Sequence, residues 1–223
     1  MSKLDFYRRN LPHIHPENAV FFFTYNLEGA IPKRVIQGWK HELEELERTL
    51  KKYETNEQII QNHLHNYRRH HFQRYEKYLD ETKEGPRFLN RPEVAQTVVQ
   101  SIRFLAAQGH WKPICWSIMP NHVHLIAHKI DYVMRCLQRH KAHTAREINK
   151  ILGKERINRV WHSETFDHYF RNRMKCCQKV LYTLLNPEKA GLVRRWWDHP
   201  FTHLEPEYYH LIGAAYRPPT RMD

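Results

Sequence analysis

Residues 111–129 read WKPICWSIMPNHVHLIAHK and set the expected architecture of the chain. The two apolar runs of this stretch, 111–119 and 122–129, are separated only by Pro120 and Asn121, a dipeptide suited to a tight turn. The many aromatic and β-branched residues of these runs favour extended backbone. The stretch therefore predicts an antiparallel β-hairpin.

Apolar spacing outside this hairpin alternates between strand-like and helix-like. The run AVFFFTY at 19–25 predicts a buried strand, and 161–170 predicts another. Apolar positions at three- and four-residue steps predict helices at 35–53, 57–79, 90–105, 132–152 and 173–185. The last helix is expected to end at Asn186, because Pro187 disfavours helical geometry in the residue before it. This order predicts an α+β fold, an antiparallel sheet with packed helices.

The size and composition bound the domain organisation. With 223 residues and 41% hydrophobic content, the chain is expected to form one domain over 1–223, with a helical insertion at about 55–85 and a C-terminal extension after about 195. No run approaches the roughly 18 apolar residues that span a bilayer, and the N-terminus lacks a signal-peptide run. The four cysteines show no C-x-x-C spacing. A cytoplasmic protein with no membrane partner is expected.

The positive charge is concentrated in the second half of the chain. The net charge is +12, and residues 101–200 hold 18 Lys and Arg against 7 Asp and Glu, whereas residues 1–100 hold 16 against 14. Such a distribution favours a polyanionic partner, although a solvated basic face is the simpler alternative.

Three His-x-His patterns occur among the eighteen histidines: His13/His15, His63/His65 and His122/His124. The second pair falls in a helical pattern, where a two-residue step points the rings apart. The first pair lies between two prolines, where nothing else fixes a site. His122 and His124 lie in a strand pattern, so both rings project from one face and can bind one ion. Two surface histidines beside a sheet are the alternative.

A tyrosine lies one predicted helix away from this pair. Gln178, Tyr182 and Asn186 form a row at four-residue spacing, separate from the apolar stripe of the same helix. One row can hold a nucleophile and a ligand. Spacing alone does not select Tyr182 among twelve tyrosines, and a packing role remains the alternative.

Four segments resemble, in matching order, the REP-associated tyrosine transposases of the single-tyrosine HUH superfamily. They are LPHIHPENAVFFFTY from Leu11, MPNHVHLI from Met119, WHSETFDHYFR from Trp161 and YTLLNPEKAGLV from Tyr182. The resemblance covers about residues 7–193. Asn172 departs from it, since the family more often has Asp there, and the basic insertion is long for some relatives.

The resemblance implies a ferredoxin-like or RRM-like HUH nuclease fold, with the histidine pair on a central strand and Tyr182 as the nucleophile on a later helix. It implies Asn186 as a third metal ligand beside His122 and His124. Mg²⁺ or Mn²⁺ is expected, and two imidazoles suit Mn²⁺ better. The implied activity is cleavage and rejoining of hairpin-forming single-stranded DNA through a 5′-phosphotyrosine, by a monomer or homodimer in the cytoplasm and nucleoid.

Seven cations are expected to surround this site and contact DNA phosphates: Arg135, Arg139, Lys141, Arg146, Lys150, Arg171 and Arg173. Three tryptophans are candidates for base stacking, with packing as the alternative: Trp161, Trp196 and Trp197.

Three rival hypotheses remain. Tyr169 is the nearest rival nucleophile, because it follows Asp167 and His168 in another matching segment. A non-catalytic protein that binds hairpin DNA or RNA is the main rival from another class. A zinc hydrolase is weaker, because no third His, Cys or acidic ligand follows the pair at a recognisable spacing.

Overall fold

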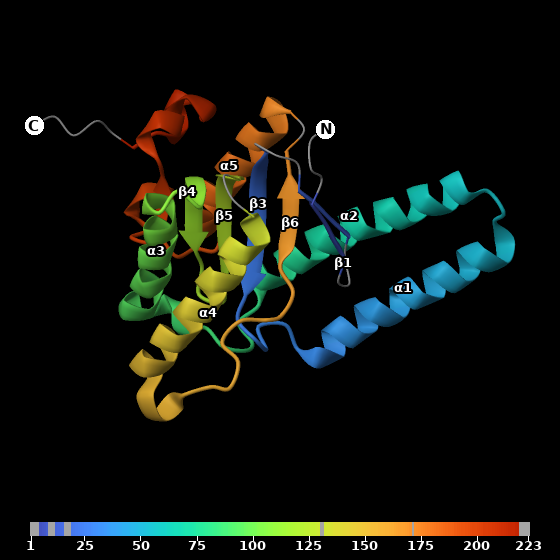
Figure 1. The fold of residues 1–223 in the computed structure, drawn as a ribbon, viewed down its shortest axis with the longest axis horizontal. Coiled ribbons are helices and arrows are strands. Elements are labelled where there is room, and N and C mark those ends of the chain that lie inside the picture. Colours follow the sequence, from blue (N-terminus) through green and yellow to red (C-terminus); the bar gives the residue numbers. More distant parts are fainter. Residues whose placement is uncertain (1–4, 9–11, 16–18, 130–131, 171, 219–223) are drawn as a thin grey trace, which may run out of the picture. The chain divides into compact units, whose positions relative to one another are not determined.

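The computed structural model (Figure 1) describes residues 5–8, 12–15, 19–129, 132–170 and 172–218. The chain divides into two compact units, one formed by residues 1–27 with 87–223 and the other by 28–86. None of the helices in these described ranges is both long and apolar enough to cross a membrane.

The larger unit is built on a five-stranded antiparallel sheet of order β6-β3-β5-β4-β7. Its strands are β3 (Val20–Asn26), β4 (Trp111–Ile118), β5 (His122–Lys129), β6 (Phe166–Tyr169) and β7 (Thr202–Leu204). The predicted hairpin is confirmed as β4 and β5 at the centre of the sheet, and the expected α+β class is confirmed with it. Two further short strands, β1 (Asp5–Arg8) and β2 (Pro12–His15), pair with each other.

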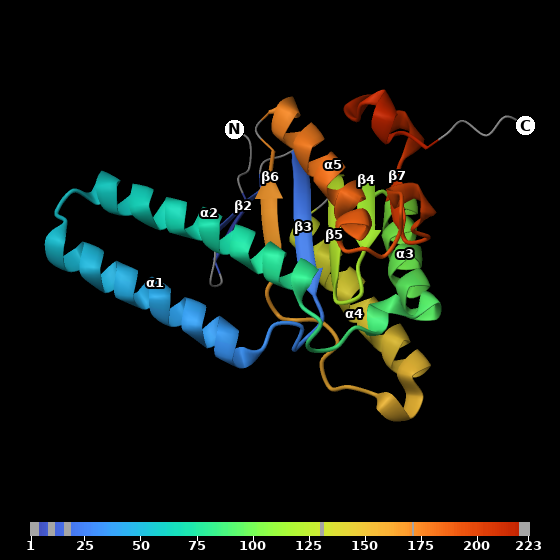
Figure 2. The same cartoon turned by 180° about the vertical axis from the view of Figure 1, so that it is seen from behind.

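Helices cover both faces of this sheet (Figures 1 and 2). The helices α3 (Pro92–Ala107) and α4 (Val133–Leu152) lie on one face, and α5 (Arg173–Lys189) lies on the other. Strand β3 shows the division, because its alternate side chains point to opposite faces. Tyr25 contacts His140 on α4, whereas Phe22 contacts Tyr182 on α5. Both faces of β3 are buried, which explains its unbroken apolar sequence.

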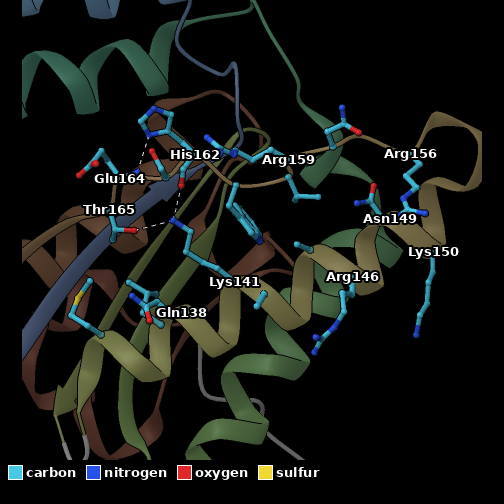
Figure 3. Close-up of a pocket in the computed structure, with 18 of the residues that line it drawn as sticks. Gln138, Lys141, Arg146, Asn149, Lys150, Arg156, Arg159, His162, Glu164 and Thr165 are labelled. Atoms are coloured by element: carbon cyan, nitrogen blue, oxygen red, sulfur yellow. Dashed lines mark hydrogen bonds between the residues drawn. The ribbon is translucent and has the colours of Figure 1, made fainter. Parts of the chain in front are cut away.

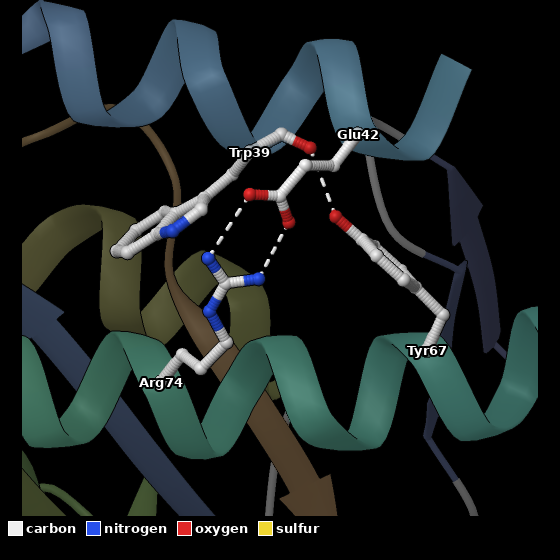
Figure 4. A network of polar contacts seen from close by, with 4 residues as sticks. All are labelled: Trp39, Glu42, Tyr67 and Arg74. Carbon is white, nitrogen blue, oxygen red and sulfur yellow. Dashed lines mark hydrogen bonds and ion pairs between the residues drawn. The ribbon is translucent and has the colours of Figure 1, made fainter. Parts of the chain in front are cut away.

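The smaller unit is a helical hairpin of α1 (Lys33–Tyr53) and α2 (Glu57–Glu81). Trp39 of α1 is buried against rings of α2, and the hydroxyl of Tyr67 donates to its carbonyl oxygen at 2.9 Å. Arg74 makes two hydrogen bonds to the carboxylate of Glu42, and its guanidinium lies 5.7 Å from the Trp39 ring (Figure 4). The two helices are therefore joined by the contacts of Trp39 with the rings of His71, Tyr75 and Tyr78, with polar contacts around them.

The compact unit at 28–86 includes α1 as well as α2, whereas the expected insertion began only at about 55. The single-domain organisation itself stays a prediction.

Two sequence predictions were wrong in detail. Helix α5 continues through Pro187 to Lys189, and the Ala190 amide closes its last turn by donating to the carbonyl of Asn186. The strand expected at 161–170 is reduced to β6 with one isolated bridge at Trp161. Between them, the carbonyl of His162 and the hydroxyl of Thr165 accept hydrogen bonds from Lys141 instead of pairing with a strand.

Candidate metal and tyrosine site

His122 and His124 lie side by side on the α5 face of the central strand β5. Their strand neighbours share that face, because directly paired residues of antiparallel strands point the same way. His124 is paired with Thr24 on β3 and with Ser117 on β4. Both imidazoles are buried, with 1% and 0% of their surface exposed. The prediction that the two rings share one face is confirmed.

The ring nitrogens of the pair converge. The Nε2 atoms of His122 and His124 lie 3.1 Å apart. Each Nδ1 is held by an oxygen on the other side of its ring: that of His122 lies 2.7 Å from Oδ1 of Asn121, and that of His124 lies 2.9 Å from the hydroxyl of Thr24. Metal-binding histidines are held in this way, with one nitrogen on an oxygen partner and the other free for the ion.

The state and spacing of the two rings suit a cation. Burial, followed by the charges of His122 and Lys179, holds the pKa of His124 well below its ordinary value, so the ring is neutral and keeps a lone pair. The observed separation of 3.1 Å is short enough for both nitrogens to bind one divalent cation.

Tyr182 projects from α5 onto this pair. Its ring centroid lies 5.5 Å from that of His124 and 6.5 Å from that of Phe22, in edge-on contacts. The rival Tyr169 is paired with Phe21 on β3, and Phe21 stacks on Phe23 rather than on Phe22. Tyr169 therefore lies on the opposite face of the sheet from the histidine pair.

Asn186 lies one helical turn beyond Tyr182 and is fully buried. Its side-chain oxygen and nitrogen have no hydrogen-bond partner among the described residues. A buried amide without partners is costly, and such a group in a native protein calls for an explanation such as a missing ion. The orphaned oxygen is consistent with a ligand role.

Two lysines flank the tyrosine ring. The Nζ atom of Lys179 lies 4.0 Å from the ring centroid of Tyr182 and 4.3 Å from that of Phe22, and Nζ of Lys189 lies 4.8 Å from the Tyr182 centroid. These ammonium groups place positive charge beside the hydroxyl-bearing ring. Neither lysine was predicted from the sequence, although Lys179 and Lys189 lie three and seven residues from Tyr182 along α5. Asn121 directly precedes His122 and was considered only as a turn residue, whereas Thr24 reaches His124 only through the pairing of β3 with β5.

The expectation that the predicted DNA-contacting cations surround Tyr182 was wrong for five of the seven. Five of them lie on α4, across the sheet from α5: Arg135, Arg139, Lys141, Arg146 and Lys150. Arg173 is exposed at the first residue of α5, and Arg171 lies outside the described residues. The reason is topological, since α4 begins at the far end of β5 and returns over the other face.

The remaining sequence candidates lie elsewhere. His63 and His65 lie on α2 and His13 and His15 on β2. Trp161 and Trp196 are buried, with 5% and 3% exposure, so they pack within the protein rather than stack on bases.

Among solved structures, the chain is similar to a REP-associated tyrosine transposase bound to a REP hairpin. The TM-score is 0.51 at 16% sequence identity, and the match covers 94% of this chain and 84% of that one. At this identity the similarity concerns the fold. No protein-family model matches the chain, and no curated protein matches it.

Proposed function

We propose that this protein is a metal-dependent, single-tyrosine HUH endonuclease and strand transferase that acts on hairpin-forming single-stranded DNA. One observation carries the proposal: the converging Nε2 atoms of His122 and His124, with the Tyr182 ring in edge-on contact with the ring of His124. The similarity in fold to a tyrosine transposase supports it.

The proposed metal ligands are His122, His124 and the side-chain oxygen of Asn186. A bound Mg²⁺ or Mn²⁺ would withdraw charge from the non-bridging oxygens of a phosphodiester. The chain's own groups orient the ligands: Thr24 and Asn121 hold the far nitrogens of the two rings, and burial keeps His124 neutral. The lysines beside Tyr182 add positive charge where a phosphate would lie.

Tyr182 is the proposed nucleophile. Its phenolic oxygen would form a bond to phosphorus while the bond from phosphorus to the 3′ oxygen breaks. The phenolic proton passes to solvent, and the departing 3′ oxygen takes up a proton. The products are a 5′-phosphotyrosine and a free 3′-hydroxyl, so the number of phosphoester bonds is unchanged and a second 3′-hydroxyl can reverse the step without ATP.

The proposed substrate is a DNA hairpin with a single-stranded flank. The solved neighbour is bound to a hairpin, and the net charge of +12 suits a nucleic acid. Of the phosphate contacts predicted from the sequence, Arg171 and Arg173 are proposed for the cleaved strand. Those on α4 lie across the sheet and are proposed to contact DNA away from the cleaved bond: Arg135, Arg139, Lys141, Arg146 and Lys150. The proposal includes action as a monomer or homodimer on DNA of the nucleoid.

The decisive experiment incubates the protein with Mg²⁺ or Mn²⁺ and end-labelled hairpin oligonucleotides drawn from the gene's own flanks. We expect a denaturant-resistant adduct on the downstream fragment. It should be abolished by Tyr182→Phe, by His124→Ala and by chelator, and retained in Tyr169→Phe, the matched control on the other face of the sheet.

Each alternative gives a different result. Tight hairpin binding with no cleavage under either metal would replace the proposal by the non-catalytic DNA- or RNA-binding function. Cleavage that survives Tyr182→Phe would exclude Tyr182 as the nucleophile. Zinc-supported hydrolysis without an adduct would indicate a zinc hydrolase.

A further inference from the structure

A groove of about 820 Å³ runs between α4 and the segment 153–165 that follows it (Figure 3). Its floor is apolar and includes Leu137, Val160 and Trp161. The groove lies entirely within the larger unit of the fold. Its volume is large enough to hold several chemical groups of an extended ligand. The groove does not include any residue of the histidine and tyrosine site.

The walls of the groove are strongly basic. Five of its nineteen lining residues are Lys or Arg, and one, Glu164, is acidic. The cations come from two elements: Lys141, Arg146 and Lys150 from α4, and Arg156 and Arg159 from the following segment. Because cations on both walls repel each other, an anion between them would stabilise the arrangement.

The groove has a fixed inner part and a rim. Lys141 is fixed, since its Nζ donates to the carbonyl of His162 at 2.7 Å and to the hydroxyl of Thr165 at 3.1 Å. Asn149 bridges the two walls, because its side chain exchanges hydrogen bonds with the backbone of Ile157 at 2.9 Å in both directions. These contacts hold the segment against α4 in the absence of a ligand.

At the rim, two guanidinium groups are available. Neither Arg146 nor Arg156 has a side-chain hydrogen bond or ion pair with any residue in the described part of the chain, and both are exposed. In Figure 3 the Arg146 side chain projects from α4 away from the facing segment. Guanidinium groups at the rim suit the planar oxygens of phosphodiesters.

The groove is on the opposite face of the sheet from the proposed catalytic site. Trp161 on its floor packs against Tyr25 of β3. The adjacent residue of β3, Thr24, points to the other face of the sheet and holds His124. A nucleic-acid strand lying in the groove would therefore be separated from Tyr182 by the β-sheet.

We propose that this groove is a second, non-catalytic binding site for single-stranded DNA, in which the cations of its walls and rim contact successive backbone phosphates. Contacts to phosphates carry no sequence information, so this binding should tolerate any sequence. The choice of DNA over RNA as the ligand rests on the proposed function. The inference that the groove binds a polyanion does not rest on it.

The test measures equilibrium binding of a fluorescein-labelled oligothymidylate in chelator over a range of salt concentrations. The variant Arg146→Gln/Arg156→Gln removes two rim cations without touching a buried group. Its control, Lys40→Gln/Lys51→Gln, removes two exposed charges from α1. We expect the groove variant to bind about tenfold more weakly, with a salt slope reduced by about 1.4 for two lost phosphate contacts, and the control to change neither.

Equal losses in the groove variant and the control would overturn the proposal, because they would show general electrostatics. Unchanged binding in the groove variant, or tighter binding of oligouridylate than of oligothymidylate, would overturn it as well. The measurement does not depend on cleavage, so the groove variant can show weaker binding even if the protein does not cut DNA. If the protein does cut, the groove variant should raise KM with kcat unchanged, whereas Tyr182→Phe abolishes kcat.

Discussion

The hydroxyl of Tyr25 lies 2.6 Å from Nε2 of His140 in the fully buried interface between the sheet and α4. The other ring nitrogen of His140 lies 2.9 Å from the hydroxyl of Ser101 on α3. This chain of hydrogen bonds ties one strand and two helices together on the face that does not carry the proposed catalytic site.

Acid should destabilise the protein through His140. Burial, followed by the charges of Lys141 and His143, lowers the pKa of His140 to about 3, whereas an unfolded histidine has a pKa of about 6.5. Between these values the unfolded chain binds a proton that the folded protein does not. The contribution of His140 is therefore complete above about pH 6.5 and is lost by about 1.4 kcal/mol per pH unit as the pH falls toward 3.

The measurement is urea unfolding of wild type and His140→Asn between pH 7 and 4. The variant should be less stable at pH 7 by about 1–3 kcal/mol, because Tyr25 loses its partner, and its stability should fall less steeply with acid. An unchanged slope would mean that other buried histidines account for the acid sensitivity.

Thr24→Val should weaken Mn²⁺ binding about ten- to a hundredfold. The hydroxyl of Thr24 holds Nδ1 of His124 at 2.9 Å, and loss of such a partner lets the ring take other orientations and tautomers. Titration calorimetry with Mn²⁺ provides the readout. Thr202→Val is the matched control, a buried strand threonine whose hydroxyl bonds to Ser117 at 2.8 Å. Equal effects in both variants would argue against a specific role for Thr24.

Lys179→Met should strengthen Mn²⁺ binding about two- to fivefold. The ammonium group of Lys179 contributes to the low pKa of His124, so it opposes positive charge at that ring and should oppose a cation there. Removing a half-buried charge of this kind changes the free energy of binding by about 0.5–1 kcal/mol. Lys175→Met, an exposed change one turn earlier on α5, should have no effect. Weaker binding in Lys179→Met would contradict this electrostatic account.

Two Gly→Ala changes in the helical hairpin should have opposite signs. Gly85 has a φ of +79°, and a Cβ there would lie 2.6 Å from the carbonyl oxygen of Gly29, so Gly85→Ala should destabilise the unit by about 2 kcal/mol or more. Gly38 lies within α1 with open space around it, so Gly38→Ala should stabilise it by about 0.5–1 kcal/mol. Hydrogen exchange of the α1 and α2 amides would report both changes. Faster exchange in Gly38→Ala would contradict the prediction.

The strand and helix positions were largely predictable because the apolar periodicity is strong and local. The β4–β5 hairpin and the buried strand β3 follow from their residues alone. The short strands β1, β2 and β7 carry no such signal, because three or four residues are too few for a period. The end of α5 was missed because a proline only biases the preceding residue away from helical geometry, and Asn186 keeps that geometry here.

The sequence by itself determined that His122 and His124 share a face, because alternation along a strand is a property of the backbone. It also determined the four-residue row of Tyr182 and Asn186 along one helix. The tertiary structure adds that Thr24 holds the ring of His124, that Tyr169 faces away from the pair, and that the cations of α4 lie across the sheet from Tyr182. Local periodicity fixes which side chains share a face of a helix or strand. Which of these faces come together depends on the pairing of distant strands and on the side of the sheet that each helix covers.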